Sequence, residues 1–224
     1  MTDPKPILLF DLDGTLIDSA PDLVETMNTI LRRHGRTTLP IDTVKKLVGD
    51  GARALLDRGF KQTGAPASAE QLDALITEFL EIYVPNCAVL SRPFEGVTDA
   101  LDGFAKTGYR MGVCTNKPQA PSETILTELG LMPYFEAVVG GDYFPVRKPD
   151  PRHLLGALEL MEASGQSAIM VGDSYNDVAA ARNADMPVIL VTFGYTTTPV
   201  ESLGGDILVD RFSDIPGAVT RLHA

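Results

Sequence analysis

The chain has 224 residues, of which 44% are hydrophobic and 22% are charged, a composition typical of a globular protein with one sizeable domain or one domain carrying a smaller insert. Its formal net charge of -11 argues against nucleic acid as a partner, because binding to a phosphate backbone relies on lysine and arginine patches. No apolar run approaches the roughly 20 residues of a membrane helix, and neither a signal peptide nor a disulfide framework is recognisable, so we expect a cytoplasmic protein.

The N-terminal part of the sequence predicts one strand followed by a helical block. The strand is expected at Ile7–Phe10, because a short continuous apolar run that ends at a turn signal is typical of a buried parallel strand. Ser19 and Pro21 favour the start of a helix, which Gly35 would end. No convincing strand pattern occurs between about residues 18 and 87. Further helical patterns run over residues 42–48, 52–63 and 69–84.

Beyond Pro93, strand and helix patterns alternate, which predicts an α/β fold with a doubly wound parallel sheet and a Rossmann-like core. We expect this core to consist of residues 1–17 and 88–224, with residues 18–87 inserted as a small helical domain. The expected helices lie around residues 97–105, 125–129, 154–158 and 179–182. The expected strands are YRMGVC, AVVGG, AIMVGD, PVILVT and DILV.

Polar side chains follow four of the expected strands at the point where each strand ends. In an open parallel sheet, ligands bind beyond the carboxyl ends of the strands, so these side chains should converge on one crevice. They are Asp11 and Asp13 after the first strand, Thr115 and Asn116 after YRMGVC, Lys148 after AVVGG, and Asp173 and Asp177 after AIMVG.

Four carboxylates beside one lysine would repel one another without a cation. Carboxylate oxygens favour Mg²⁺, which usually binds one or two carboxylates together with waters and a substrate phosphate. Asp173 is the best candidate for direct ligation, whereas Asp177, one helical turn later, could ligate through water or orient Lys148. The sequence therefore predicts Mg²⁺ and a phosphate ester in this crevice.

The two aspartates after the first strand suit phosphoryl transfer. A carboxylate can attack phosphorus to form an aspartyl phosphate, which splits a difficult hydrolysis into two steps. One of Asp11 and Asp13 would attack, and the other would protonate the leaving oxygen and later activate water. Thr115 and Asn116 can donate hydrogen bonds to phosphoryl oxygens, and Lys148 would supply positive charge to the transferring group.

Each of these motifs has an ordinary structural interpretation when it is taken alone. The aspartates can form an Asx turn before a helix, Thr115 and Asn116 can form a turn or a cap, and Lys148 can be a surface lysine. Only their occurrence together, at four strand ends, favours a catalytic site.

The stretches FDLDGTLID, VCTNKP, RKPDP and VGDSYNDVAAARNADM resemble the four ordered motifs of the haloacid dehalogenase superfamily, and the helical insert resembles its small helical cap. The resemblance covers nearly the whole chain, and within the superfamily it is greatest to the phosphoglycolate phosphatases. It implies that Asp11 is the nucleophile and that Asp13 is the general acid and base. The expected substrate-binding residues of the core are Gly14, Thr15, Thr115, Asn116 and Lys148. The expected metal ligands are Asp11, Asp13 (through its carbonyl), Asp173 and Asp177.

The superfamily also contains dehalogenases, phosphonate hydrolases and sugar-phosphate mutases. The related dehalogenases lack the second aspartate, so Asp13 argues against that activity. Phosphonate hydrolases use a lysine of the cap, but Lys45 and Lys46 are more typical of a solvated helix face. Mutases share all four motifs, so the core does not exclude them.

The stretch VGDGARALL of the insert is a candidate for substrate specificity. Gly49 and Gly51 flank Asp50, and Arg53 follows. One interpretation is a turn between helices with a solvated arginine. The other is a cap loop that closes over the substrate, in which backbone amides and Arg53 meet the carboxylate of a small acid. Asp50 would have to point away from a doubly anionic substrate.

The sequence thus leads us to expect a Mg²⁺-dependent phosphomonoester hydrolase that works through an aspartyl phosphate, with 2-phosphoglycolate as the preferred substrate. The alternatives are a phosphatase or mutase for another small sugar phosphate, and a non-catalytic interaction protein, which the intact set of charged residues disfavours. The expected partner is a small phosphorylated metabolite, bound by a monomer or a homodimer.

Overall fold

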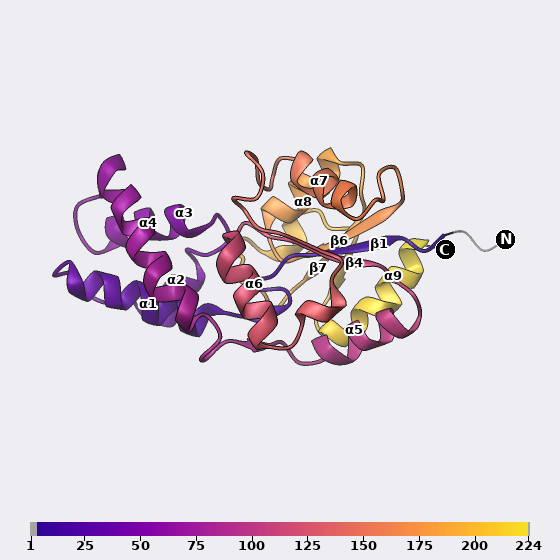
Figure 1. The fold of residues 1–224 in the computed structure, drawn as a ribbon, viewed down its shortest axis with the longest axis horizontal. Helices are drawn as coiled ribbons and strands as arrows, with labels where there is room; N and C mark the ends of the chain where they lie inside the picture. Colours follow the sequence, from indigo (N-terminus) through magenta and orange to yellow (C-terminus); the bar gives the residue numbers. More distant parts are fainter. Residues whose placement is uncertain (1–3, 224) are drawn as a thin grey trace.

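The structure is a computed structural model that describes residues 4–223, which form a six-stranded parallel sheet with helices on both faces and a group of helices at one end (Figure 1). The strand order is β5-β4-β1-β6-β7-β8, so β1 lies between β4 and β6. The expected doubly wound α/β fold is confirmed. The strands of the sheet are β1 (Ile7–Phe10), β4 (Met111–Cys114), β5 (Ala137–Val139), β6 (Ala168–Gly172), β7 (Val188–Val191) and β8 (Ile207–Val209).

Alternate side chains of β1 enter the two layers of the hydrophobic core, as the period of two along a strand requires. Leu8 and Phe10 belong to the layer that contains the buried residues of α5, α6 and α9, whereas Ile7 and Leu9 belong to the layer under α7 and α8. Figure 1 shows α7 and α8 on the opposite side of the sheet from α5 and α9. These helices are α5 (Val97–Lys106), α6 (Gln119–Glu128), α7 (Arg152–Leu160), α8 (Tyr175–Asn183) and α9 (Ile215–His223).

Four of the helices between β1 and β4 in the chain pack on one another at the end of the molecule that lies away from the chain termini (Figure 1). Met27, Ile30 and Leu31 recur at helical spacing along α1 and are fully buried in this group. We refer to α1–α4 as the insert. Its helices are α1 (Ala20–Arg33), α2 (Ile41–Lys45), α3 (Ala52–Gln62) and α4 (Ala69–Tyr83).

The two chain crossings between the core and the insert lie side by side. The two-residue strand β2 (Ile17–Asp18) pairs antiparallel with β3 (Arg92–Pro93). Asp22 reinforces this junction, because its carboxylate accepts hydrogen bonds from the backbone N–H groups of Leu90 and Ser91. Both ends of the insert are therefore tied to each other at the edge of the core.

The elements agree with the sequence pattern except where an element is very short or its pattern is broken. The helix expected over residues 42–48 is limited to α2, and β2 and β3 are too short to give a pattern. Helix α9 was not expected, because Pro216 and Gly217 stand in its first turn. Within residues 4–223, no helix combines the length and apolar character needed to span a membrane. Short 3₁₀ helices are η1 (Val84–Asn86), η2 (Met132–Tyr134), η3 (Val200–Ser202) and η4 (Phe212–Asp214).

Candidate active site

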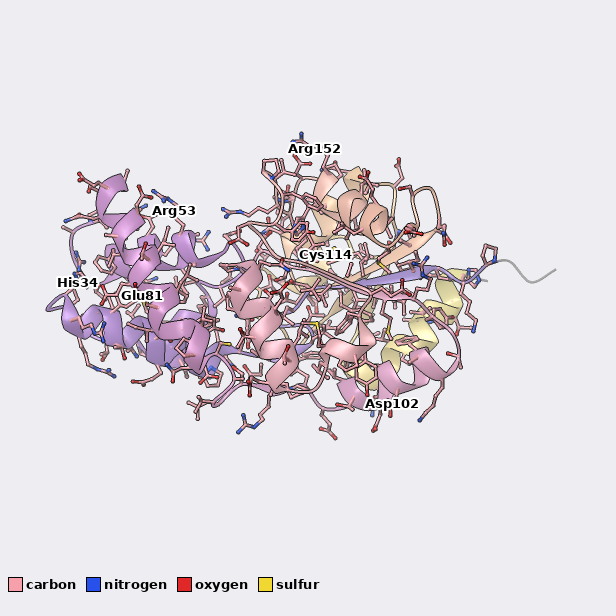
Figure 2. The ribbon with its side chains drawn as sticks, in the orientation of Figure 1. His34, Arg53, Glu81, Asp102, Cys114 and Arg152 are labelled. Carbon is pink, nitrogen blue, oxygen red and sulfur yellow. The ribbon has the colours of Figure 1, made fainter. Side chains whose placement is uncertain are left out.

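The polar residues expected at four strand ends meet at one edge of the sheet. Because β4, β1 and β6 are neighbours, the segments that follow them are adjacent. Cys114, the last residue of β4, marks this region near the middle of the molecule (Figure 2). Lys148 reaches the same place from the segment between β5 and α7 and donates a hydrogen bond to the carbonyl of Cys114 at 2.6 Å. The predicted convergence of these segments is confirmed.

Lys148 is the centre of a buried charge network. Its Nζ lies 2.6 Å from Oδ1 of Asp177 and 2.9 Å from Oδ1 of Asp11, and its side chain is 1% exposed. Burial alone would lower the pKa of this lysine, but the attraction of the two carboxylates outweighs it and raises the pKa above its ordinary value. The ammonium is therefore held charged beside Asp11.

Asp177 uses both carboxylate oxygens within the protein. Oδ1 accepts from Lys148, and Oδ2 accepts from the backbone N–H groups of Asp173 and Ser174 and from the Ser174 hydroxyl. The contacts with Ser174 form a capping box that begins α8. Of the two roles considered for Asp177, which are ligation through water and orientation of Lys148, the second fits these contacts, because both carboxylate oxygens already have protein partners.

Asp11 and Asp173 are buried carboxylates whose pKa values are raised. Burial, followed by the repulsion of Asp177, raises the pKa of Asp11 to about 6 despite the opposing effect of Lys148. Burial and the repulsion of Asp11 and Asp177 raise the pKa of Asp173 well above its ordinary value. One oxygen from each of the three carboxylates lies within 4.8 Å of the others. This donor set fits a hard divalent cation, which would relieve the repulsion.

The turn after β1 brings the backbone close to this cluster. Gly14 has φ +86°, and a Cβ atom at this position would lie 2.5 Å from Oδ2 of Asp173. The glycine is required both by the positive φ and by the lack of space. Thr15 is fully buried, and its hydroxyl has no hydrogen-bond partner among the described residues. The expected contacts of Gly14 and Thr15 with a substrate stay predictions.

Thr115 and Asn116 begin the segment after β4, as expected. The Thr115 hydroxyl oxygen accepts from the backbone N–H of Lys117 at 3.2 Å, which leaves its hydrogen free to donate. The Asn116 amide donates to the carbonyls of Lys148 at 3.0 Å and of Gly49 at 3.1 Å. The Asn116 side chain therefore joins the core to the insert rather than offering its amide hydrogens to a phosphoryl group.

Asp13 has different partners from Asp11. Ser19 donates a hydrogen bond of 2.5 Å to Oδ1 of Asp13, and Nζ of Lys117 lies 3.0 and 3.2 Å from the two carboxylate oxygens. Lys117 is not among the site residues that the sequence predicts, although it lies within VCTNKP. A lysine three residues after a strand is usually exposed, so only its place beside the two phosphate-binding candidates could have indicated a functional position.

A pocket lies between this edge of the core and the insert. Its volume of about 40 Å³ has room for only a few water molecules, so the insert is closely docked on the core. Gly51, with φ +85°, would place a Cβ atom 3.0 Å from the carbonyl oxygen of Asn116. The pocket is lined by Asp13, Leu23, Val48, Gly49, Gly51, Ala52, Leu55, Phe79, Tyr83, Thr115, Asn116, Lys117 and Pro118. The Gly49–Gly51 loop therefore lies where a closing loop was expected.

Arg53 is not part of this pocket. Its guanidinium forms an exposed ion pair of 2.5 Å with Asp73 of α4, and Figure 2 shows Arg53 on the insert, far from Cys114. The reason is helix geometry: successive residues of a helix are turned by about 100°, so the α3 positions that face the pocket, Ala52 and Leu55, leave Arg53 on another side. The expectation that Arg53 meets the substrate carboxylate is not supported by this arrangement.

Asp50 points its carboxylate at protein groups and does not line the pocket. It forms an ion pair with Arg58 and accepts a hydrogen bond of 2.7 Å from Asn176 of α8. These hydrogen bonds lower the pKa of Asp50 in spite of its partial burial. The condition that Asp50 point away from an anionic substrate is therefore met, and the same contact links the insert to α8.

Comparisons with known proteins agree with this geometry. A sequence model described as haloacid dehalogenase-like hydrolase matches residues 8–191. The chain is 46% identical over 215 residues to a phosphoglycolate phosphatase of Caulobacter vibrioides, covering 96% of this chain and 91% of that protein. It is 41% identical over 215 residues to a phosphoglycolate phosphatase of Agrobacterium fabrum, covering 96% and 92%.

The fold is also shared with solved structures. The crystal structure of a predicted phosphoglycolate phosphatase from Haemophilus somnus superposes with a TM-score of 0.89 at 29% identity, and the match covers 96% of this chain and 97% of that one. CbbY from Rhodobacter sphaeroides, solved in complex with phosphate, superposes with a TM-score of 0.80 at 23% identity and with 95% and 96% coverage. This second likeness concerns the fold alone.

Proposed function

The chain belongs to the haloacid dehalogenase-like hydrolase family, and from this premise we propose that it is a Mg²⁺-dependent phosphatase that hydrolyses 2-phosphoglycolate to glycolate and phosphate through an aspartyl phosphate on Asp11. The substrate is suggested by the names of relatives that are 46% and 41% identical over nearly the whole chain. The chemistry is argued from the residues at the carboxyl edge of the sheet.

The observation that carries the proposal is the different surroundings of two aspartates that stand two residues apart. Asp11 lies 2.9 Å from the ammonium of Lys148 and within the carboxylate cluster. Asp13 instead contacts the Ser19 hydroxyl and the Lys117 ammonium, and it lines the pocket under the insert. Two carboxyl groups in different environments can take two roles, one as nucleophile and the other as acid and base.

In the first step, a carboxylate oxygen of Asp11 attacks phosphorus, and the bond from phosphorus to the ester oxygen breaks. Asp13 donates its proton to that leaving oxygen, which departs as the hydroxyl of glycolate. In the second step, Asp13 takes a proton from water as the water attacks the phosphorus of the acyl phosphate. The Asp11 carboxylate and inorganic phosphate are released, and Asp13 again carries a proton.

Lys148 and Thr115 would assist by contacting the phosphoryl oxygens. The ammonium of Lys148 is fixed beside Asp11 by Asp177, so positive charge is already in place where negative charge accumulates. The Thr115 hydroxyl hydrogen is available at the end of the neighbouring strand β4.

The carboxylates of Asp11 and Asp173 and the backbone carbonyl of Asp13 would hold the Mg²⁺ ion. The fit is supported by the close approach of the buried carboxylates of Asp11, Asp173 and Asp177, and by the raised pKa values of Asp11 and Asp173, to which burial and then repulsion between these carboxylates contribute. When bound, Mg²⁺ supplies positive charge that offsets the charge on the phosphoryl oxygens. Asp177 would support the metal site indirectly, through its contacts with Lys148 and with the backbone N–H of Asp173.

The proposal is tested by measuring kcat/KM with Mg²⁺ for a panel of phosphate esters: 2-phosphoglycolate, pentose and hexose phosphates, nucleotides and an aryl phosphate. We expect a large preference for 2-phosphoglycolate. A preference for a sugar phosphate would retain the phosphatase and reject the substrate. Absence of turnover on every ester by a folded protein would reject the hydrolysis itself.

The covalent step has its own readout. Borohydride reduces an acyl phosphate to an alcohol, so treating the protein during turnover should convert Asp11 to homoserine, which mass spectrometry detects. Asp11→Asn should show neither homoserine nor turnover, because an amide is not a competent nucleophile. Substantial turnover by a folded Asp11→Asn protein would contradict the role of Asp11.

A further inference from the structure

Lys117 is a buried cation that the two chemical steps leave without a role. Its side chain is 2% exposed, and its Nζ lies 3.0 and 3.2 Å from the carboxylate oxygens of Asp13. The same ammonium donates a hydrogen bond of 2.5 Å to the hydroxyl of Tyr83, the last residue of α4, and lies 4.4 Å from the centre of the Tyr83 ring. Lys117 therefore belongs to the core but is held by a residue of the insert.

Apart from Lys117, the pocket has little that could bind an incoming anion. Leu23, Leu55 and Phe79 make its wall on the insert side apolar. Of the described residues that line the pocket, Lys117 is the one basic residue and Asp13 the one acidic residue. A carboxylate that leaves water for such surroundings is stable only beside a cation, because an unpaired buried charge is costly.

We propose that Lys117 binds the carboxylate of the substrate and so selects a phosphorylated small acid over a neutral phosphate ester. This inference rests on the proposed function. In 2-phosphoglycolate, one methylene carbon separates the ester oxygen from the carboxylate. Asp13 must lie within hydrogen-bond reach of that ester oxygen to protonate it. Since the Lys117 ammonium contacts Asp13, it stands within the reach of a carboxylate that is one carbon away.

Tyr83 makes this recognition dependent on the insert. Its hydroxyl fixes the ammonium from the side of α4, so the carboxylate site is complete only while the insert is docked on the core. Binding of the correct acid and closure of the pocket would then favour each other, because each contributes contacts to the other. Arg53, paired with Asp73 at the surface, takes no part in this arrangement.

The test compares 2-phosphoglycolate with 2-hydroxyethyl phosphate, which replaces the carboxylate by a neutral hydroxymethyl group. The quantity of interest is the ratio of the two kcat/KM values. We expect Lys117→Met to lower this ratio at least about tenfold, the usual scale for loss of one charged contact. Lys117→Arg should retain part of the ratio, because it keeps the charge. Arg53→Ala should leave the ratio at its wild-type value.

A purely structural role of Lys117 would give a different result. If Lys117 only balances the charge of Asp13, Lys117→Met lowers both kcat/KM values equally, and the proposal is overturned. A ratio that falls in Arg53→Ala but not in Lys117→Met would transfer carboxylate recognition to Arg53 and would also overturn it.

Binding without turnover gives a second, independent measurement. Calorimetry with the Asp11→Asn protein measures the affinity for each ester. Adding Lys117→Met should weaken the binding of 2-phosphoglycolate at least about tenfold more than the binding of 2-hydroxyethyl phosphate. Equal weakening of the binding of both esters would reject the role of Lys117. A wild-type ratio near one would instead reject the substrate assignment, and the carboxylate role with it. A high wild-type ratio that Lys117→Met leaves unchanged would reject the role of Lys117 alone.

Discussion

Asp177 holds Lys148 through an ion pair of 2.6 Å in which both side chains are shielded from solvent. The other oxygen of Asp177 accepts hydrogen bonds from Ser174 and so begins α8. One carboxylate thus fixes the position of a helix and of the ammonium that faces Asp11. Asp177 therefore couples the N-terminus of α8 to the position of the positive charge beside Asp11.

We expect Asp177→Asn to reduce both stability and activity. An amide presents one oxygen and one NH₂ group, so whichever way it is turned, the NH₂ faces either the Lys148 ammonium or the donors of Ser174. Breaking a buried pair from one side should lower the free energy of unfolding by about 3 kcal/mol. Misplacing Lys148 should lower kcat about 100-fold. Urea denaturation and steady-state kinetics measure the two effects.

A matched control for this prediction is Asp150→Asn. Asp150 forms an ion pair of the same 2.6 Å length with Arg152, but here Arg152 is largely exposed and Asp150 is partly exposed. Because exposed pairs contribute little, we expect small changes in stability and kinetics. An Asp177→Asn protein that keeps wild-type kcat would show that Lys148 does not depend on Asp177.

Asp173→Asn should separate two effects of this residue: the electrostatic cost of burying its carboxylate and its contribution to metal binding. Burial and the repulsion of Asp11 raise the pKa of Asp173 well above its ordinary value, so a charged Asp173 destabilises the metal-free protein at neutral pH. The neutral amide can keep the hydrogen bond from the Tyr195 N–H. We therefore expect the Tm without metal to rise by a few degrees, roughly the effect of 1 kcal/mol.

With Mg²⁺ the order of stability should reverse. Binding to the folded state raises the Tm of the wild type, by an amount that grows with the metal concentration, whereas Asp173→Asn should show little change. Thermal denaturation across a Mg²⁺ series, with NaCl at matched ionic strength as the control, measures this. An equal Mg²⁺-dependent rise in both proteins would place the metal elsewhere.

The core of the site could be predicted from the sequence because it depends mainly on the order of the strands. Continuous apolar runs identify the buried parallel strands, and polar residues that follow such runs must lie at one edge of the sheet. Asp11, Lys148 and Asp173 need no further information to be brought together. Their position is a consequence of topology, and a small error in the ends of a strand does not change it.

The insert side of the site depends on finer geometry. Whether Arg53 faces the pocket or α4 is decided by the rotation of α3 about its own axis. The apolar pattern of α3 does not specify which side of the helix faces the pocket and which faces α4. The Lys117 ammonium is held in part by Tyr83, which α4 brings against it from another part of the chain. Contacts between two helices or two units that are remote in sequence leave no periodic signal.

Gly51→Ala should impair closure of the insert. The added Cβ would lie 3.0 Å from the Asn116 carbonyl, in a residue with φ +85°, so both the contact and the backbone oppose the docked position. We expect the KM for 2-phosphoglycolate to rise about fivefold, which corresponds to about 1 kcal/mol. Gly35→Ala is the control: φ is +65° there, but no atom lies within 4 Å of the new Cβ. Equal effects of the two substitutions on KM would show that backbone strain, and not docking, is responsible.

His153 should make the folded protein sensitive to mild acid. This residue of α7 is fully buried, its Nε2 lies 3.1 Å from the carbonyl of Gly140, and its Nδ1 has no partner among the described residues. Burial, with a further contribution from Lys148, lowers the pKa of His153 to about 4, although Gly140 and Asp150 act in the opposite direction. The folded protein therefore keeps His153 neutral at a pH where the unfolded chain has already bound a proton.

The sign of the pH dependence follows from this difference. Between the unfolded pKa of about 6.5 and the folded pKa of about 4, the unfolded state binds more protons, so the free energy of unfolding falls as the pH falls. His153→Gln can still donate to Gly140 but does not titrate. Relative to this variant, the wild type should lose about 2 kcal/mol between about pH 7.5 and about pH 5. Urea denaturation of both proteins across this range measures the difference, in which the titration of the shared carboxylates cancels. A difference that is constant with pH would mean that His153 becomes protonated as readily in the folded protein as in the unfolded chain.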